Sequence, residues 1–262
     1  MQSGRFASGR LAYRFWPADR PRGRVIISHG FAEHSGRYGH VAAALNQASL
    51  SVWAPDHRGH GGSEGERANI ESVWTAVDDL DLLVDLVEAG SQPGPLFLLG
   101  HSMGGLIATA YAEQHQDRLD GLVLSGALLH VDPGVVALAD AEEIPDLGLA
   151  DAVSRDPDVV RAYKEDPDVY LGPPPRGFLR SAGEVGQVRS RFSELSLPIL
   201  VMHGSADLLV NPQALRDVVA GVASDDLTAV MWPGLWHEIF NEPEKDRVIA
   251  TAVDWISARI PA

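Results

Sequence analysis

A five-residue stretch at positions 100–104, Gly-His-Ser-Met-Gly, constrains the fold of this chain more than any other feature. An apolar run at 95–99 precedes it, and a helix-compatible run of small residues at 105–112 follows it. A strand, a sharp turn and a helix in this order form a nucleophile elbow, in which a serine is held in a strained and exposed conformation. Small residues flank such a serine because the strand and the helix approach each other closely. The pattern therefore predicts that Ser102 is a nucleophile, rather than an ordinary serine in a glycine-rich turn.

Strands and helices alternate along the 262 residues. This alternation predicts a large α/β unit built on a mostly parallel sheet with helices on both faces. Short apolar runs predict strands at 25–28, 52–55, 96–99, 122–125, 199–202 and 228–232. Helices are expected at 38–48, at 70–89, directly after the elbow and at 246–259. In the second of these helices, apolar residues recur at the spacing of one buried face: Val73, Val77, Leu80, Val84 and Val87.

This alternation is interrupted between about 128 and 192, where no clear strand is visible and acidic residues and prolines are frequent. Three consecutive prolines at 173–175 mark a stiff, non-helical connection. We therefore divide the chain into a core at 1–127, an inserted cap at 128–192 and the rest of the core at 193–262. The cap is expected over the C-terminal edge of the sheet, where the active sites of open α/β sheets lie. A set of ordinary packing helices without a lid role is the alternative.

A base and an acid must accompany the serine, because a hydroxyl is a weak nucleophile until its proton is taken. In sheets with a nucleophile elbow, these partners follow in the order serine, acid, histidine. His237 is the only histidine after residue 203, and it lies between the last expected strand and the last expected helix. Asp207 follows the strand at 199–202 and is expected to orient the His237 ring and to stabilise its charged form. The other acids of this region fit less well, since they fall on or beside the next helix or adjoin the histidine: Asp217, Asp225, Asp226 and Glu238.

Two backbone N–H groups are needed to stabilise the oxyanion of the tetrahedral intermediate. One is expected from Met103, the residue after the nucleophile. The other is expected from Phe31, in the loop at 29–32 that follows the first predicted strand.

The segment at 56–63 has the appearance of a metal site, because Asp56, His57 and His60 lie close together in the sequence. A metal site needs three or four converging ligands with supporting groups, and no third histidine stands at a suitable spacing. We expect a buried polar network that braces this loop near the elbow. Neither a metal nor a cofactor is expected.

Charge and cysteine content exclude several classes of function. The chain has 21 Lys and Arg against 36 Asp and Glu, a net charge of -15, which argues against nucleic-acid binding and against tight docking on anionic membranes. Zero cysteines exclude disulfides, thiolate catalysis and Cys-ligated zinc. No apolar run approaches the ~18 residues of a membrane span, and no signal core follows Met1. We therefore expect a cytoplasmic protein with at most weak, transient lipid contact, and the sequence does not indicate its oligomeric state.

Three motifs resemble those of the monoacylglycerol lipases of the α/β-hydrolase superfamily: HGFAEHSGRY at 29–38, DHRGHG at 56–61 and GHSMGG at 100–105. The stretches SRDP at 154–157 and PGLWHE at 233–238 resemble actinobacterial members, and the similarity covers nearly the whole chain. The resemblance implies an eight-stranded sheet, a mobile cap and cofactor-free hydrolysis of one acyl chain from glycerol. Its pattern places the triad on Ser102, Asp207 and His237 and the oxyanion donors on Phe31 and Met103. Phe31 replaces a smaller residue that is common in the family, so we expect it to narrow the pocket floor.

Three further residues are candidates for contact with the substrate. The segment at 143–145 resembles an acidic-apolar-proline segment of bacterial monoacylglycerol lipases, and the resemblance implies that Glu143 faces the glycerol. Arg37 and Glu33 lie near the oxyanion loop and are candidates for bracing it. The alternatives are a solvated carboxylate for Glu143 and a structural ion pair for the other two.

Two alternatives to a monoacylglycerol lipase stay open at this point. One is a general carboxylesterase or a lysophospholipase, which uses the same triad. The other is a hydrolase-like protein without catalysis that only binds ligands, against which the complete set of Ser102, Asp207 and His237 argues.

Overall fold

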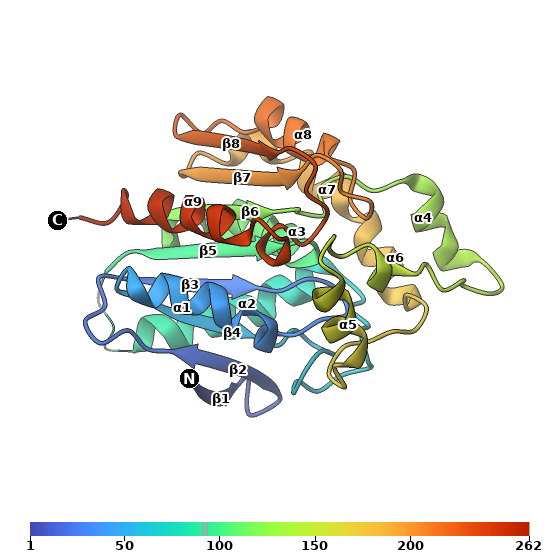
Figure 1. Cartoon of the computed structure of the whole chain (residues 1–262), viewed down its shortest axis with the longest axis horizontal. Helices are drawn as coiled ribbons and strands as arrows, with labels where there is room; N and C mark the ends of the chain where they lie inside the picture. Colours follow the sequence, from blue (N-terminus) through green and yellow to red (C-terminus); the bar gives the residue numbers. More distant parts are fainter. Residues whose placement is uncertain (91, 93, 262) are drawn as a thin grey trace.

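The central feature of the fold is an eight-stranded sheet in the order β1-β2-β4-β3-β5-β6-β7-β8 (Figure 1). The structure is a computed structural model that describes residues 1–90, 92 and 94–261. The strands are β1 (Gln2–Phe6), β2 (Leu11–Trp16), β3 (Gly23–Ser28), β4 (Leu50–Pro55), β5 (Leu96–His101), β6 (Gly121–Ser125), β7 (Ile199–Gly204) and β8 (Leu227–Trp232). β2 pairs antiparallel with both β1 and β4, whereas β3 to β8 pair in parallel. The predicted, mostly parallel α/β-hydrolase sheet is confirmed.

The first two strands were not predicted individually from the sequence. β1 and β2 lie at the edge of the sheet and are exposed or half-buried along most of their length, so neither forms a continuous apolar run. The turn that joins them contains Ala7, Ser8 and Gly9 at φ values of 50°, 58° and 85°. Two non-glycine residues in this left-handed region are uncommon, and the sequence therefore shows no standard hairpin signal.

Helices cover both faces of the sheet. α1 (Gly39–Gln47) and α9 (Lys245–Ser257) pack on one face, and α2 (Val73–Ala89), α3 (Met103–His115) and α8 (Gln213–Gly221) pack on the other. The alternation along β3 illustrates this arrangement. Val25 and Ile27 pack on the face that α1 and α9 cover, and Ile26 packs on the face that α2, α3 and α8 cover.

The predicted buried face of α2 is confirmed, since each of the five residues predicted to form it is at most 1% exposed. The helix begins at Val73 rather than at residue 70. Ser72 caps it by accepting a hydrogen bond from the backbone N–H of Trp74, as serine commonly does at a helix start.

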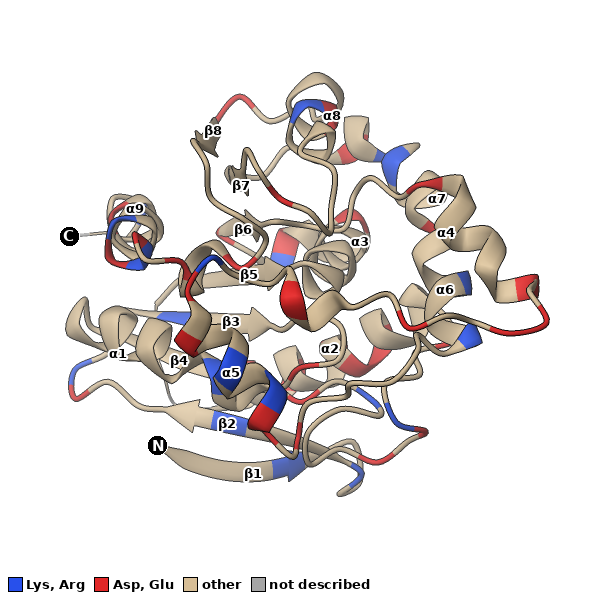
Figure 2. Cartoon of the chain, turned by 45° about the vertical axis from the view of Figure 1, so that its right-hand side comes forward, with Lys and Arg blue, Asp and Glu red and all other residues tan. Residues whose placement is uncertain are grey.

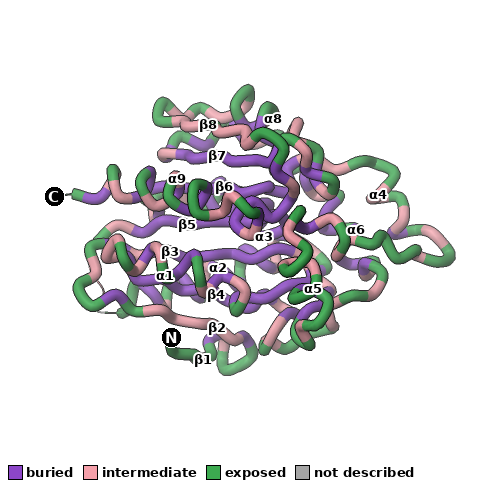
Figure 3. Tube along the Cα trace, in the orientation of Figure 1, coloured by how far each residue is buried: buried purple, intermediate pink, exposed green. Residues whose placement is uncertain are grey.

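The segment between β6 and β7 is described throughout and contains helices but no strand. Its helices are α4 (Pro133–Ala137), α5 (Pro157–Glu165), α6 (Arg176–Gly183) and α7 (Val185–Arg189). Figure 1 shows α4, α5 and α6 beyond the end of the sheet to which the arrows of β3 and β7 point. Figure 3 shows that the central strands are buried, whereas much of this segment is exposed.

The loop after α4 forms an acidic tip, which is visible in Figure 2. It carries four exposed acidic residues: Asp140, Glu142, Glu143 and Asp146. In the described part of the chain, no helix combines the length and the apolar character required to cross a bilayer.

The helix after the elbow carries a buried carboxylate, Glu113, which is 6% exposed. Neither of its oxygens has a hydrogen-bond partner among the described residues, and the guanidinium of Arg191 is 3.9 Å away. Burial raises the pKa of Glu113 to about 8, because the charged form loses its hydration.

The Glu113 carboxyl makes the stability depend on pH. An unfolded glutamate has a pKa of about 4.3, so the stability that the protonated group contributes is complete below that pH and is lost as the pH rises through about 8. We expect Glu113→Gln to gain about 2 kcal/mol relative to the wild type between pH 6 and pH 9, measured by urea unfolding. Glu71→Gln, at an exposed position, is the control and should show no such change. A constant difference at all pH values would contradict the buried, protonated state of Glu113.

Candidate active site

Ser102 lies in the predicted elbow, between the last residue of β5 and the first residue of α3. Its backbone has φ 52° and ψ -121°, a strained conformation for a residue with a side chain. The neighbouring glycines are required by space. A Cβ atom at Gly100 would lie 2.5 Å from the carbonyl oxygen of Gly104, and one at Gly104 would lie 2.1 Å from that of Ser28. The elbow therefore has the geometry that the motif predicts.

Asp207 and His237 form a buried hydrogen-bonded pair. The Nδ1 of His237 lies 2.8 Å from Oδ2 of Asp207, and the Nε2 of His203 lies 2.9 Å from the same oxygen. The other oxygen, Oδ1, accepts the backbone N–H groups of Leu209 and Val210. Burial disfavours the charged carboxylate, but the two histidines outweigh it and hold the pKa of Asp207 well below its usual range.

The same pair raises the pKa of His237. Burial opposes the charged imidazolium, but the charge and hydrogen bond of Asp207 outweigh burial, with further support from Glu238 and Glu33. With Nδ1 occupied by Asp207, the Nε2 atom of His237 is the one available for proton transfer.

Ser102, Asp207 and His237 line one pocket of about 750 Å³. The segment between β6 and β7 contributes much of its apolar wall, including Val135, Leu149, Val153, Phe178 and Leu179. A pocket of this size and character is typical of small-molecule sites.

The loop after β3 passes directly against the nucleophile, since a Cβ atom at Gly30 would lie 3.2 Å from the Cβ of Ser102. His29 accepts the backbone N–H of His57 at Nε2, so its Nδ1 carries the proton and donates it to the carbonyl of Gly30 at 2.7 Å. The N–H of Gly30 donates to Oε1 of Glu33, also at 2.7 Å. The bond from His29 holds the peptide unit between Gly30 and Phe31, and the bond to Glu33 holds the preceding unit between His29 and Gly30. In a trans peptide, the Phe31 N–H points opposite to the held carbonyl.

Phe31 lines the pocket and stacks on Phe178 of α6, with ring centroids 3.8 Å apart and planes at 20°. Met103 begins α3, so its N–H belongs to the first helical turn, where backbone donors have no intrahelical acceptor. The structure thus brings both predicted oxyanion residues to the elbow.

The loop at 56–63 contains the polar network expected from the sequence. Asp56 accepts hydrogen bonds from three residues: Ser35, Gly62 and Arg14. Nε2 of His57 forms a separate hydrogen bond with the hydroxyl of Ser28. Burial lowers the pKa of His57 to about 3 and that of His60 to about 4, so both rings are neutral near pH 7. Asp56 and His57 thus bond with different partners within this network.

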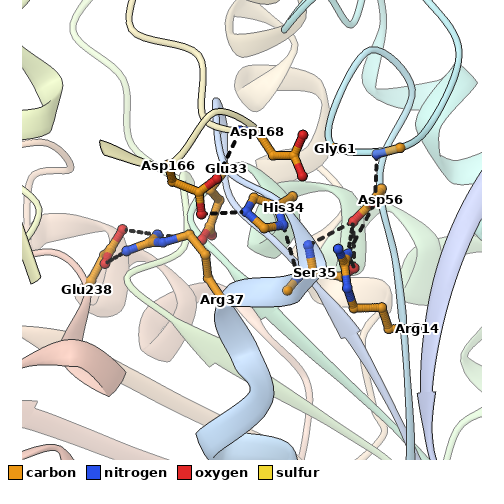
Figure 4. A network of polar contacts seen from close by, with 12 residues as sticks. Arg14, Glu33, His34, Ser35, Arg37, Asp56, Gly61, Asp166, Asp168 and Glu238 are labelled. Atoms are coloured by element: carbon orange, nitrogen blue, oxygen red, sulfur yellow. Dashed lines mark hydrogen bonds and ion pairs between the residues drawn. The ribbon is translucent and has the colours of Figure 1, made fainter. Parts of the chain in front are cut away.

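His34, Asp166 and Asp168 form another group with metal-ligand chemistry. Nδ1 of His34 accepts the N–H of Gly36 at 3.2 Å, so Nε2 carries the proton and donates it to Asp166 at 3.0 Å (Figure 4). A neutral histidine binds a metal through a ring lone pair, and here neither ring nitrogen offers one. The N–H of Tyr170 also donates to the carbonyl of Ala32 at 2.8 Å. These contacts join the loop after β3 to the segment after α5.

Comparison with known proteins identifies the family of this chain. Residues 19–244 match the family described as serine aminopeptidase, S33. The chain belongs to this family. It is 42% identical to the monoacylglycerol lipase of Mycolicibacterium smegmatis, over 96% of this chain and 94% of that protein. It is 31% identical to the human monoglyceride lipase, over 97% of this chain and 89% of that protein.

The crystal structure of Paleococcus ferrophilus monoacylglycerol lipase superposes with a TM-score of 0.84 at 31% identity, covering 95% of this chain and 99% of that one. The resemblance to monoacylglycerol lipases is confirmed.

Of the three further residues that were candidates for contact with the substrate, the structure brings Glu33 and Arg37 to the site and leaves Glu143 outside it. Glu33 lines the pocket, and Arg37 forms ion pairs with both Glu33 and Glu238. Glu143 is exposed in the acidic tip and is not among the residues that line the pocket. The role expected for Glu143 is thus not supported by its position, because the loop after α4 points it toward solvent.

Sequence reasoning missed two residues of the site. Glu238 was considered only as an acid for the neighbouring histidine, yet it pairs with Arg37. The ring of Tyr163, on α5, faces the guanidinium of Arg37, whose Cζ atom lies 4.5 Å from the ring centroid. Both contacts join residues far apart in the chain, and no local spacing predicts them.

Proposed function

We propose that this chain is a carboxylic ester hydrolase that cleaves monoacylglycerols to glycerol and a free fatty acid through an acyl-enzyme. The observation that carries the proposal is the placement of a strained Ser102 in one apolar pocket with a His237 held by Asp207. The monoacylglycerol and monoglyceride lipases among its relatives support the substrate class.

The proposed reaction follows from the atoms that the pocket presents. Oγ of Ser102 attacks the ester carbonyl while Nε2 of His237 takes its proton. The N–H groups of Phe31 and Met103 stabilise the oxyanion that forms. His237 then gives the proton to the glycerol oxygen as that bond breaks, and a water activated by the same nitrogen releases the fatty acid.

The segment at 128–192 serves in this proposal as a cap between the core parts at 1–127 and 193–262. Its apolar side chains line the pocket and contact the acyl chain, while the sheet supplies the reacting groups. Phe31, stacked on Phe178, narrows the pocket where the core and the cap meet.

Substrate selection tests this proposal, because a pocket of about 750 Å³ admits one acyl chain with a compact head. We expect kcat/KM for a monoacylglycerol to exceed that for the matching triacylglycerol by about 100-fold or more. Assays in mixed detergent micelles at equal ester concentration measure this ratio. Glu143→Ala is the control and should leave the ratio unchanged, because Glu143 is solvated. Equal kcat/KM on both lipids would contradict selection by the cap.

Contact with a lipid surface is proposed to be weak. The net charge of -15 and the acidic tip oppose binding to anionic bilayers. We expect little co-sedimentation with phosphatidylserine vesicles at any salt concentration. Strong binding that weakens as salt is added would require a basic patch and would overturn this expectation.

A further inference from the structure

A buried ion cluster joins the two loops that flank the proposed nucleophile. Nη1 of Arg37 lies 2.6 Å from Oε2 of Glu33 and 2.6 Å from Oε1 of Glu238, and Nη2 lies 2.7 Å from Oε2 of Glu238. The side chains of Arg37, Glu33 and Glu238 are 10%, 3% and 5% exposed, respectively. We call these three residues the Arg37 cluster, and Figure 4 shows Arg37 between the two carboxylates.

Each carboxylate of the Arg37 cluster is attached to a part of the proposed machinery. Glu33 accepts the N–H of Gly30, which belongs to the loop that presents Phe31. Glu238 directly follows His237 in the chain, and its backbone N–H donates to the carbonyl of Val153. Arg37 therefore bridges the oxyanion loop and the loop of the proposed base.

The carboxylate oxygens of the Arg37 cluster are already engaged by the protein. Oε1 of Glu33 accepts from Gly30 and from the hydroxyl of Tyr38, and its Oε2 accepts from Arg37. Both oxygens of Glu238 accept from Arg37, and Oε2 also accepts from Asn241 at 2.8 Å. The Tyr163 ring covers the guanidinium. This arrangement favours holding the loops in place over hydrogen bonding to a substrate.

We propose that Arg37 and Glu238 are positioning residues, whose two-bond ion pair holds the His237 loop against the oxyanion loop. The inference rests on the proposed function, since it needs Ser102, His237 and Phe31 in their proposed roles. A planar guanidinium can bond both oxygens of one carboxylate and reach a second carboxylate, whereas a lysine ammonium is a point charge without this fork. The geometry thus depends on arginine itself, and charge alone is not sufficient.

The cluster also acts on His237 through its charge. Two carboxylates and one guanidinium leave one net negative charge beside the ring. The groups that face His237 are Asp207 after β7, His101 of the elbow at a ring separation of 4.8 Å, and the carboxylates of Glu33 and Glu238. Loss of the Glu238 charge should therefore make the imidazolium less favourable.

Arg37→Lys tests the geometry while keeping the charge. Rates are expressed per active site, counted by titration with a fluorophosphonate, so that unfolded protein does not contribute. We expect kcat on a monoacylglycerol to fall ~10- to 100-fold with KM within about twofold, because misplacement of the base affects the reaction more than binding. Arg259→Lys is the matched control, since Arg259 bonds both oxygens of Asp226 and neither residue lines the pocket. Its kcat should stay within about twofold of the wild type.

Glu238→Gln tests the charge. We expect the acidic limb of its kcat/KM profile to move to lower pH, whereas that of Arg37→Lys stays near the wild type. If the Arg37 cluster had a merely structural role, the acidic limb of the profile would stay at the wild-type pH in both variants. If Arg37→Lys does not fold, Glu238→Asp replaces it, because aspartate keeps the charge but is one methylene shorter, so its carboxylate no longer reaches both guanidinium nitrogens from the same backbone position. The same loss of kcat is then expected.

Several results would overturn the inference. An unchanged kcat in Arg37→Lys, or a loss equal to that of Arg259→Lys, would show that the bridge does not position the base. A raised KM for monoacylglycerol, with unchanged kinetics on the methyl ester of the same acid, would make Arg37 a head-group ligand instead. Failure of the proposed function is distinguishable, because the wild type would then either not react with the fluorophosphonate or react with it without hydrolysing monoacylglycerol.

Discussion

Ser102→Ala is expected to lower kcat on monoacylglycerols by a factor on the order of 10⁵ to 10⁶, close to abolition, while the protein keeps its fold. Alanine removes the attacking oxygen and nothing else, since it has the same backbone requirements as serine at φ 52°. The residual rate should reflect the oxyanion donors and binding alone. Kinetics on a monoacylglycerol, with thermal unfolding followed by circular dichroism, measure both parts of this prediction.

The control for this variant is Ser190→Ala, at an exposed serine of the segment between β6 and β7. It should retain the wild-type kcat. Hydrolysis by Ser102→Ala near the wild-type rate, with unchanged melting, would remove Ser102 from the reaction. A large drop in the melting temperature would instead mean that the variant reports on folding.

Asp207→Asn is expected to lower kcat by ~10⁴ with little change in fold. In the wild type, one carboxylate oxygen faces both His237 and His203, and the other accepts two backbone N–H groups. An asparagine side chain has only one acceptor oxygen, so its amide must either meet these backbone donors or face the two histidines. When the NH2 group faces the histidines, it donates to Nδ1 of His237, and the ring favours the tautomer with its proton on Nε2. That tautomer cannot take the proton from Ser102.

The pH profile of Asp207→Asn provides a second readout. Asp207 opposes the effect of burial on His237, so its neutralisation should lower the pKa of that ring. The acidic limb of the remaining activity should therefore lie at lower pH than in the wild type. A modest, pH-independent loss of activity would instead show that Asp207 acts only through packing.

How much the sequence predicted depends on whether the signal was local. The elbow was predictable because the strand, Ser102 and the helix follow one another within a short stretch, and the close approach at Gly100 and Gly104 permits only small residues. Asp207 and His237 were predictable from chain order, since each follows a parallel strand at the same edge of the sheet.

The features that the sequence did not predict come from long-range contacts and from exposure. β1 and β2 form an edge hairpin without an apolar run, so their pattern resembles that of a loop. The pairing of Arg37 with Glu238 depends on the folding of two distant loops against each other. Glu143 was selected for its neighbours in the sequence, but its loop is exposed, and a sequence motif alone does not report where an exposed loop points.

The proposed function requires the transfer of one acyl group to Ser102 of this chain. Its most direct test is reaction of the wild type with a fluorophosphonate, followed by peptide mass spectrometry and by assay of monoacylglycerol hydrolysis on the same samples. We predict a single adduct per chain on Ser102, and a loss of hydrolysis in proportion to the adduct. Full hydrolysis by completely labelled protein, or inactivation with the adduct on another residue, would contradict the claim. A chain that neither reacts with the fluorophosphonate nor hydrolyses the lipid would be a binding protein with a hydrolase fold.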